Sequence, residues 1–349
     1  MKFRVRSVAT TLLATVLSLG VVSCTPGDPE GPAVPSIDPS PSQIKPVDGP
    51  WPLTGIRGPV VDRPVVSVKI ENSGDARPQK GLDEADIVFE QIVEGGITRL
   101  MALYHSQIPT EIYPIRSARP MDGPIIAPFG GVFVCSGGQW PMLNRVTDLG
   151  VQLLSMDGGD HGFWRISSRW APHNVAGDVQ EFLDQAYEGH TDPPAPMFNY
   201  ADAADTNSAT LFGVPATALY ANMSGSFHPN WAWDAQTKSW LRFEWGDPFV
   251  NVDDWQLHAK NVIALNVDVG STGYSDPAGN PVPETIVVGS GTGVYMADGH
   301  SVAITWEKPN ELTQFVFRDP SGNPIDVVPG NTWIELVPTS SGSIEVVYE

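Results

Sequence analysis

The dipeptide Gly95-Gly96 sits between two β-rich arms in the segment Glu90–His105, EQIVEGGITRLMALYH. Paired glycines suit a two-residue hairpin turn, because both turn positions need a positive φ angle. Such a turn fixes the register of the two strands. Side chains alternate between the two faces of a strand, so Glu90, Glu94 and Arg99 are predicted to share one face of the hairpin. Two carboxylates beside an arginine then form a candidate site.

Short β-rich runs and stretches of helical spacing surround this hairpin over residues 51–190. The runs at 65–70, 87–93, 97–105, 132–135 and 151–156 predict strands, and the spacing at 139–149 and 178–187 predicts helices. Residues 229–349 are nearly all β-rich and contain Asp-Gly and Gly-Asn turns. We predict an α+β fold: an N-terminal domain with a mixed sheet and helices (51–190), a connector (191–228), and a mostly antiparallel β C-terminal domain (229–349) packed against the first.

The first 23 residues are typical of an export signal. Basic residues precede an apolar run of 15 residues at 8–22, and the small Ser23 precedes Cys24. The run is shorter than the roughly 20 residues that a membrane-spanning helix needs. Val-Val-Ser-Cys at 21–24 resembles the bacterial lipobox, so we predict lipidation of Cys24 and anchoring to the outer face of the cell membrane. Ordinary secretion with an unmodified Cys24 is the alternative.

Residues 24–50 form the predicted tether between this anchor and the folded part. Eight prolines fall within residues 25–50, a composition that favours polyproline II and cannot build a core. The second cysteine, Cys135, lies in the apolar stretch Gly-Val-Phe-Val-Cys-Ser. We predict a buried core thiol without a disulfide partner, since lipidation occupies Cys24.

The chain carries 40 Asp and Glu residues against 20 Lys and Arg residues, a formal net charge of −20. This balance excludes non-specific nucleic-acid binding, which depends on neutralising phosphates. Arginines nevertheless gather near the hairpin, at Arg77, Arg116 and Arg119. Guanidinium groups suit bidentate recognition of carboxylate or phosphate, so these three and Arg99 are candidate anion-binding residues. The equally weighted alternative is that they pair with nearby glutamates and only pin loops to the sheet.

Three residues are candidates for acid–base chemistry: Glu90, Glu94 and His173. His173 and His161 lie on loops that also hold glycine, proline or aspartate, and a structural loop contact is the favoured interpretation for each. No zinc-ligand spacing is present, and no lysine follows the glycine-rich stretch 289–293 as a phosphate-binding loop requires. We predict no metal site and no cofactor, and binding rather than catalysis.

Five of the eleven tryptophans fall between residues 231 and 255. Exposed aromatic rings stack on sugars, so a glycan-binding surface is one interpretation. Aromatic packing across a β hairpin is the favoured one.

Several long motifs resemble the YerB-like lipoprotein family. They are Asn-Ser at 72–73, Ala-Arg-Pro-Gln at 76–79, Gly-Leu-Asp-Glu-Ala-Asp-Ile-Val-Phe-Glu at 81–90, Glu-Gly-Gly-Ile-Thr-Arg at 94–99, Arg-Ser-Ala-Arg-Pro at 116–120, Ala-Pro-His-Asn at 171–174, Ala-Lys-Asn-Val-Ile at 259–263 and Pro-Gly-Asn-Thr-Trp at 329–333. The resemblance covers residues 52–347 and implies a bacterial envelope lipoprotein with a layered α and β fold. It carries over no catalytic residue. Within its motifs, Asn72 and Asn174 join the candidate ligand-binding residues.

The chain departs from the family pattern at two places. Ile-Tyr-Pro-Ile at 112–115 replaces a Gly-Pro-Val type of approach to the arginine motif, and Val-Ala-Gly at 175–177 replaces a Leu-Tyr-Thr type of continuation. The expected function is that of a membrane-anchored extracytoplasmic lipoprotein that binds an anionic envelope ligand, such as a wall polymer, or a protein partner. A cell-envelope hydrolase or transferase acting on a phosphate-containing or glycan substrate is the alternative.

Overall fold

The computed structural model describes residues 46–349. The predicted export signal and Cys24 lie outside the described residues, as does most of the predicted tether. Residues 47–50, which the sequence assigns to the tether, instead form strand β1 (Val47–Pro50), paired antiparallel with β2 (Arg57–Val60). Within residues 46–349, no helix is both long and apolar enough to cross a membrane.

The central strands of the N-terminal half are runs rich in apolar residues, and the structure buries them on both faces. In order across the sheet they are β4 (Ile87–Ile92), β5 (Thr98–Tyr104), β3 (Val66–Glu71), β6 (Val132–Cys135) and β7 (Gln152–Ser155). β4, β5 and β3 are antiparallel, whereas β3, β6 and β7 are parallel. The predicted runs are confirmed to within two residues at each end.

Short helices cover both faces of this part of the sheet. They are α1 (Asp122–Ile126), α2 (Trp140–Asp148) and α3 (Val179–Leu183). α1 and α2 pack around Phe133 on one face, and Phe182 of α3 packs into a second core on the other. The helix predicted at 139–149 is confirmed by α2. The helix predicted at 178–187 is shorter than expected, because only the residues of α3 are helical.

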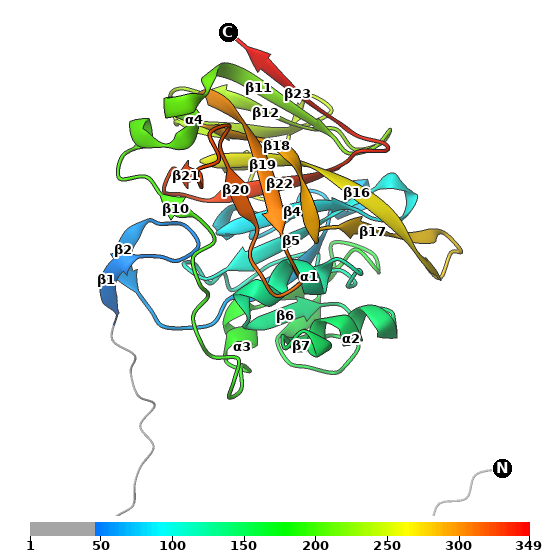
Figure 1. Ribbon diagram of the computed structural model, residues 1–349. Coiled ribbons are helices and arrows are strands. Elements are labelled where there is room, and N and C mark those ends of the chain that lie inside the picture. The colour runs from blue at the N-terminus through cyan, green and yellow to red at the C-terminus, as the bar shows by residue number, and fades with distance from the viewer. Residues whose placement is uncertain (1–45) are drawn as a thin grey trace, which may run out of the picture. The chain divides into compact units, whose positions relative to one another are not determined.

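Strands dominate the rest of the described chain (Figure 1). The main ones are β11 (Val214–Asn222), β12 (Pro229–Asp234), β13 (Ser239–Glu244), β14 (Asp247–Pro248), β15 (His258–Ala259), β16 (Asn261–Ser275), β17 (Pro281–Ile286), β18 (Gly289–Ala297), β19 (His300–Lys308), β20 (Val316–Arg318), β22 (Thr332–Pro338) and β23 (Ser343–Tyr348). Small pairs join β8 (Phe163–Arg165) to β9 (Val175–Gly177), and β10 (Asn199–Tyr200) to β21 (Asp326–Val327). The predicted connector 191–228 needs correction, because it contains α4 (Ser208–Phe212) and β11, which pairs with β12 and β23.

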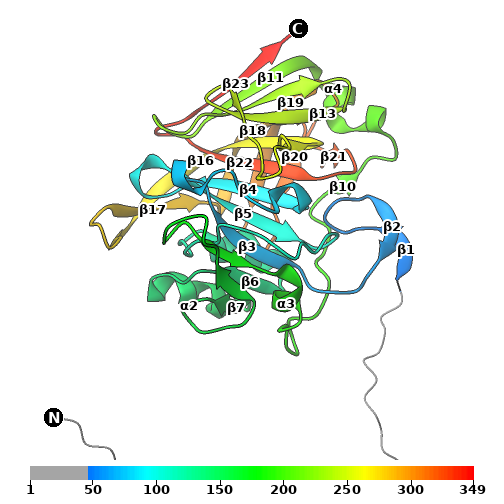
Figure 2. The same ribbon diagram turned by 180° about the vertical axis from the view of Figure 1, so that it is seen from behind.

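One strand pair joins the two predicted domains. β22 of the C-terminal part runs parallel to β16 on one side and to β4 of the N-terminal part on the other. The sheet therefore continues from one part into the other, as the views from both sides show (Figures 1 and 2). Residues of both parts share one core, as Phe89 and Phe315 do, and the structure in addition joins the two parts edge to edge.

The hairpin at Gly95-Gly96 differs from its predicted register by one residue. Both glycines have positive φ angles, 68° and 72°, as the turn prediction requires. The loop, however, contains three residues, Glu94–Gly96. A one-residue slip moves side chains to the other face. Arg99 therefore pairs with Gln91 and lies on the opposite face from Glu90, so the predicted grouping of Glu90 with Arg99 is wrong.

Because β4 and β22 hydrogen-bond along their length, we predict that residues 46–349 unfold as one cooperative unit. Circular dichroism and tryptophan fluorescence should report the same thermal midpoint. A chain that ends at residue 218 loses β22, which exposes the edge of β4, and it should stay unfolded or aggregate. A chain that ends at residue 342 is the control, since it loses only β23, which pairs with β11 alone among the described strands. Two separate midpoints in the intact protein would contradict this prediction.

Candidate functional site

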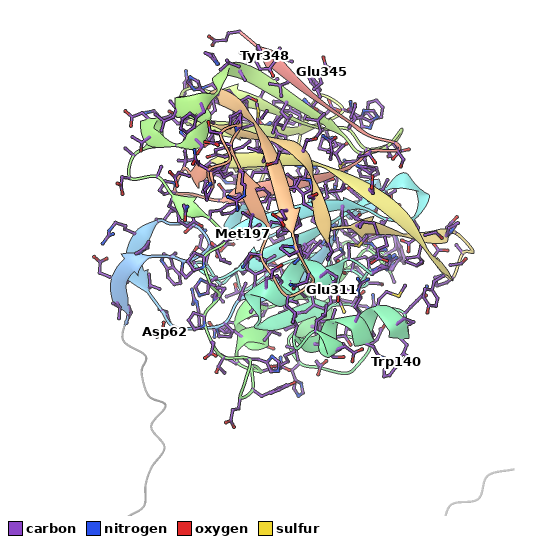
Figure 3. All side chains as sticks on the ribbon, viewed as in Figure 1. Asp62, Trp140, Met197, Glu311, Glu345 and Tyr348 are labelled. Atoms are coloured by element: carbon purple, nitrogen blue, oxygen red, sulfur yellow. The ribbon has the colours of Figure 1, made fainter. Side chains whose placement is uncertain are left out.

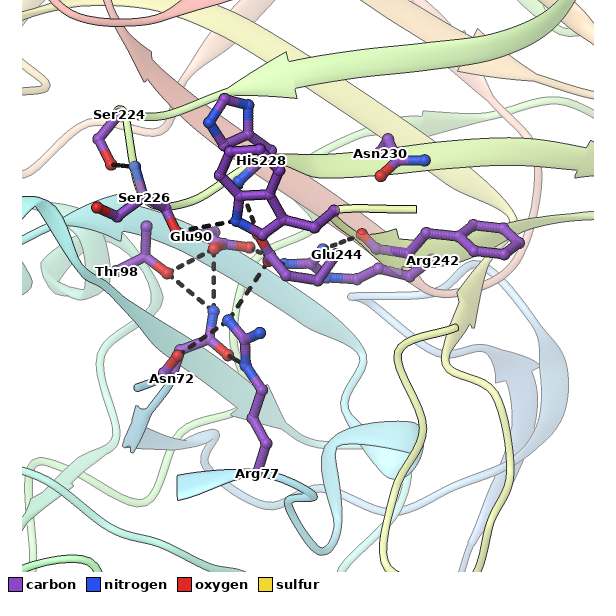
Figure 4. A network of polar contacts seen from close by, with 12 residues as sticks. Asn72, Arg77, Glu90, Thr98, Ser224, Ser226, His228, Asn230, Arg242 and Glu244 are labelled. Atoms are coloured by element: carbon purple, nitrogen blue, oxygen red, sulfur yellow. Dashed lines mark hydrogen bonds and ion pairs between the residues drawn. The ribbon is translucent and has the colours of Figure 1, made fainter. Parts of the chain in front are cut away.

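A fully buried ion pair lies at the junction of the two parts. Arg242 on β13 donates from Nη2 to Glu90 Oε2 on β4 at 2.5 Å, and neither side chain has any exposed surface. The other oxygen, Glu90 Oε1, accepts hydrogen bonds from Thr98 Oγ1 at 2.6 Å and from Asn72 Nδ2 at 3.1 Å (Figure 4). Arg77 joins this group through Glu244 at 3.4 Å. Glu90 is therefore not placed to act as an acid or base on a substrate.

We call this group, with Glu335 added, the buried ion network; its members are Asn72, Arg77, Glu90, Arg242, Glu244 and Glu335. Glu335 lies opposite Glu90 in the parallel register of β22 and β4, and its Oε1 accepts from Trp231 Nε1 at 3.0 Å. Burial, together with the neighbouring charge of Glu90, raises the pKa of Glu335 well above its usual range. With Glu335 protonated, two guanidinium groups face two carboxylates, so the charges of the network cancel.

Aromatic rings enclose the buried guanidinium group of Arg242. It lies over the rings of Phe249, Trp333 and Trp231 at 4.5, 5.0 and 5.6 Å from their centroids. Such cation–π contacts favour a charge that has left water. The network is thus a packed part of the core, and it assigns Arg77 and Asn72, both predicted as ligand-binding residues, to internal contacts.

Sequence reasoning did not single out Arg242, Glu244 or Glu335, although a signal was present. Glu335 interrupts the apolar run Trp-Ile-Glu-Leu-Val. Arg242 is two residues after Trp240 on β13, so its side chain lies on the same buried face of the strand. A charged residue at an inward position of a strand needs a buried partner. The sequence alone does not say which partner, because β4, β13 and β22 meet only in the folded protein.

Three other arginines come together beside the ends of β3 and β5. Arg99, Arg116 and Arg119, the arginine cluster, contact two carboxylates. Arg119 Nε is 2.7 Å from Glu94 Oε1, and Arg116 Nε is 3.3 Å from Glu71 Oε1. Glu94, predicted to lie beside Arg99, is instead paired with Arg119.

Strand register and one loop explain why these arginines converge. Arg99 lies opposite Glu71 of β3 on one side and Gln91 of β4 on the other, so its side chain leaves the sheet on their face. The loop that carries Arg116 runs past the end of β3, where the Arg116 amide donates to the Lys69 carbonyl at 2.8 Å. The Ser136 amide donates to the Arg116 carbonyl at 3.1 Å, which holds the loop against the end of β6.

The cluster carries an excess of positive charge. Lys69 and Asp122 form a buried pair at 2.5 Å, and burial lowers the pKa of Lys69 to about 8. Burial, with the neighbouring guanidinium groups of Arg119 and Arg116, lowers the pKa of Arg99 to about 9, so it remains cationic at neutral pH. Lys69, Arg116 and Arg119 each pair with one carboxylate, that of Asp122, Glu71 and Glu94 respectively. Arg99 adds a fourth cation, and its Nη1 donates to the Ser117 carbonyl instead of to a carboxylate.

Arg116 is the member of the cluster with free donors. No hydrogen bond within residues 46–349 uses its Nη1 or Nη2, and 21% of its side chain is exposed. His173 lies next to it, because His173 Nδ1 is 3.0 Å from the same Glu71 Oε1. A quarter of the His173 side chain is exposed. An anion that reaches this surface meets Nη atoms that donate to no acceptor within residues 46–349, beside the Glu71 carboxylate at 3.3 Å from Arg116 Nε.

The remaining predicted residues have other roles. Asn174 binds its own loop, since its Oδ1 accepts from Arg165 Nη1 at 2.7 Å. The His161 amide donates to the Gln185 side chain, which fits a structural loop contact. Cys135 is buried, and burial raises the pKa of its thiol to about 12, so the predicted core thiol is confirmed.

The tryptophans between residues 231 and 255 divide into two groups. Trp231 and Trp240 are fully buried and the partly buried Trp233 packs on Trp240, which confirms aromatic packing for these three, whereas Trp245 and Trp255 are exposed. Over the part of the chain that the structure describes, no three His, Cys, Asp or Glu side chains are grouped to hold a metal ion.

The fold and these two clusters define a sheet-dominated protein in two parts that share one sheet and carry an arginine-rich surface. The chain belongs to the family described as "Protein of unknown function (DUF3048)": its N-terminal domain matches residues 53–192, and its C-terminal domain matches residues 219–334. The resemblance seen in the sequence motifs is thereby confirmed.

Two comparisons place a Bacillus subtilis protein beside this chain. The chain is 26% identical over 296 residues to "Putative lipoprotein YerB" of strain 168, an alignment that covers 82% of this chain and 86% of that protein. A crystal structure of the YerB protein from Bacillus subtilis matches with a TM-score of 0.70 at 23% identity, covering 84% of this chain and 98% of that one. The two proteins have the same fold.

Glutamine substitutions at two facing positions test the buried ion network. The pKa of Glu335 is raised in the folded state above its ordinary value of 4.5, so the wild-type protein loses stability as the pH rises from 4.5 toward the folded pKa. Glu335→Gln removes this loss. The variant should gain on wild type by up to about 1.4 kcal/mol per pH unit between pH 5 and 7, measured by urea denaturation.

Glu90→Gln is the matched control at the same register position. It removes the 2.5 Å partner of the buried Arg242 guanidinium and leaves it the more distant Glu244 at 3.7 Å, so we predict a loss of up to about 3–5 kcal/mol. Equal effects of the two variants at every pH would contradict the assignment of the proton to Glu335.

Proposed function

We propose that this protein is an extracytoplasmic lipoprotein whose arginine cluster binds an anionic group on an envelope ligand or partner protein. The free guanidinium fork of Arg116 is the single observation that supports the proposal most. Arginines that only pin loops use their donors on the protein, as Arg119 and Arg169 do. An unused fork beside an excess positive charge suits a bidentate contact with an incoming anion.

The acidic character of the chain supports a specific contact. With a net charge of −20, the protein repels polyanions over most of its surface. An anionic ligand is therefore favoured only where cations outnumber carboxylates, as in the arginine cluster. This charge distribution favours a ligand that carries a few negative charges close together over an extended polyanion.

Anchoring to the outer face of the cell membrane through Cys24 is the second part of the proposal. It rests on the lipobox-like residues 21–24 and on the similarity to a relative whose name describes a lipoprotein. The proline-rich residues that follow Cys24 would hold the arginine cluster away from the membrane surface.

Arg116→Ala tests the binding part of the proposal. Within residues 46–349 its one ion pair is the 3.3 Å approach to Glu71, so we expect a loss of no more than about 1 kcal/mol in stability. Among sulfate, citrate and acetate, at least one anion should raise the melting temperature of the wild-type protein. Arg116→Ala should abolish that shift, and Arg57→Ala should keep it, because Arg57 is an exposed arginine outside the cluster.

The contrary result is clear. If Arg116→Ala melts many degrees lower and no anion stabilises the wild-type protein, Arg116 is structural and the proposal is wrong.

A hydrolase or transferase is the second candidate, and one contact favours it. The Glu71 carboxylate lies 3.0 Å from His173 Nδ1, and a carboxylate in this position orients an imidazole for acid–base work. Our proposal predicts that the protein hydrolyses p-nitrophenyl phosphate no faster than His173→Ala does. A rate that disappears in His173→Ala and persists in His161→Ala would favour the enzyme.

A further inference from the structure

Strand β16 changes partners along its length. Its residues 261–265 pair with β18, whereas its residues from Asp268 onward pair with β17. Between these two stretches, Asn266 and Val267 pair with neither of the two strands (Figure 1). Residues 289–292 of β18 pair with β19 and with no other strand within residues 46–349. The sheet is therefore split between β17 and β18.

A cavity of about 320 Å³ lies at this split. Its volume falls at the small end of the roughly 300–1,000 Å³ that ligand sites occupy in proteins. The polar side chains that line it are Asn266, Asp268, Ser290, Thr292 and Thr339. None of these residues belongs to the buried ion network or to the arginine cluster, so the cavity is a separate place on the protein.

The glycine-rich stretch 289–293 forms one wall of the cavity. A Cβ on Gly291 would lie only 2.6 Å from Trp306 Nε1, so a glycine is required where the indole packs against β18. Trp306 Nε1 donates to the Asn266 carbonyl at 3.1 Å, and Asn266 Nδ2 donates to Thr292 Oγ1 at 3.2 Å. These contacts tie β16, β18 and β19 together around the cavity, so its walls are formed before a ligand arrives.

The cavity offers both donors and acceptors to a ligand. Within residues 46–349, no hydrogen bond uses Ser290 Oγ, Asn266 Oδ1 or Asp268 Oδ2. Asp268 Oδ1 accepts from Thr339 Oγ1 at 2.7 Å, which holds the carboxylate in place and leaves its second oxygen open. A hydroxyl group both donates and accepts, whereas a carboxylate only accepts. A ligand that satisfies this lining must therefore carry donors and acceptors together.

The charges around the cavity disfavour an anion. Among the described residues that line it, Asp268 is the one with a charged side chain. The exposed Glu307 lies opposite Ser290 in the pairing of β18 with β19. Lys308 on β19 is fully buried, and its ammonium group donates to carbonyls of the loop that follows, including that of Glu311, which Figure 3 labels. Carboxylates thus surround the cavity without a basic side chain to offset them.

We propose that this cavity binds one neutral sugar ring. Sugar hydroxyls donate and accept, as the polar lining requires, whereas an ammonium group only donates and a phosphate or carboxylate only accepts. The C–H groups of the ring suit the apolar part of the lining, which consists of Ile286, Val288 and Trp306. This inference goes beyond the proposed function and does not rest on it, since the two sites share no residue.

Ligand-observed NMR on the full-length protein tests the assignment, in micelles of a detergent that contains no sugar. The probes are glucose, galactose and mannose, each as the free hexose and as its methyl glycosides. At least one of these rings should bind to the wild-type protein. A methyl glycoside that binds at least as tightly as its hexose points to the end of a glycan chain, and one that binds at least about fivefold more weakly points to a free sugar.

Two substitutions in the lining locate the binding. Asp268→Asn keeps the shape of the side chain and should weaken sugar binding by at least about tenfold, which corresponds to about 1.4 kcal/mol. Ser290→Trp fills the cavity and should abolish binding. Asp247→Asn removes the same charge from an exposed position on β14 outside the cavity and should change nothing. Asp268 and Ser290 are both exposed, so each variant should melt as the wild-type protein does.

Competition tests the charge of the ligand at the same site. The matching uronic acid, which has a carboxylate in place of one hydroxymethyl group, should displace the bound hexose only at an at least about fivefold higher concentration. Arg116→Ala should leave hexose binding unchanged, which separates this cavity from the arginine cluster.

Three results would overturn the inference. The first is that none of the hexoses or glycosides binds to the wild-type protein. The second is that binding persists unchanged in Asp268→Asn and Ser290→Trp. The third is that the uronic acid displaces the hexose at equal concentration, which contradicts a neutral ligand.

Discussion

The ion pair between Glu90 and Arg242 is the interaction on which the rest of the structure depends. It joins β4 to β13 with both side chains fully buried, and removing one partner of such a pair leaves an uncompensated charge in the core. The β4–β22 pairing runs through the same place, with Glu335 beside Glu90. The two parts recognised by the family models therefore form one sheet around a shared polar core.

This arrangement separates the charged residues into two groups with different tasks. The buried ion network uses Glu90, Asn72 and Arg77 internally, and its donors and acceptors face one another. The arginine cluster keeps an excess positive charge and an open fork on Arg116. Glu90, Asn72 and Arg77 of the predicted site are thus structural, whereas the Nη atoms of Arg116 donate to no acceptor within residues 46–349.

The sequence predicted the strands well, because apolar runs with β-branched residues and glycine-rich turns are local signals. It also predicted that Arg99, Arg116 and Arg119 gather near the hairpin. It failed at the loop of Glu94–Gly96, where one extra residue moves Arg99 to the other face. Local sequence does not fix the length of a Gly-Gly loop, because both two- and three-residue loops accept positive φ angles.

Contacts between residues far apart in the sequence could not be predicted either. The partners of Glu90 come from β13 and β22, more than 150 and 240 residues away along the chain. No local periodicity encodes such contacts, so Arg242 and Glu335 were not recognised as its partners. The strand β11 was missed for a related reason: its residues alternate between buried and exposed within a segment that otherwise contains turns and a short helix.

Diffraction from crystals grown in selenate tests the central claim most directly, because selenium in this tetrahedral anion is located by its anomalous scattering. In our proposal the buried ion network leaves the Arg116 fork free for an anion. We therefore predict an anomalous peak from an anion within hydrogen-bond distance of the Arg116 Nη atoms. Selenate bound elsewhere, with only water at Arg116, would contradict it.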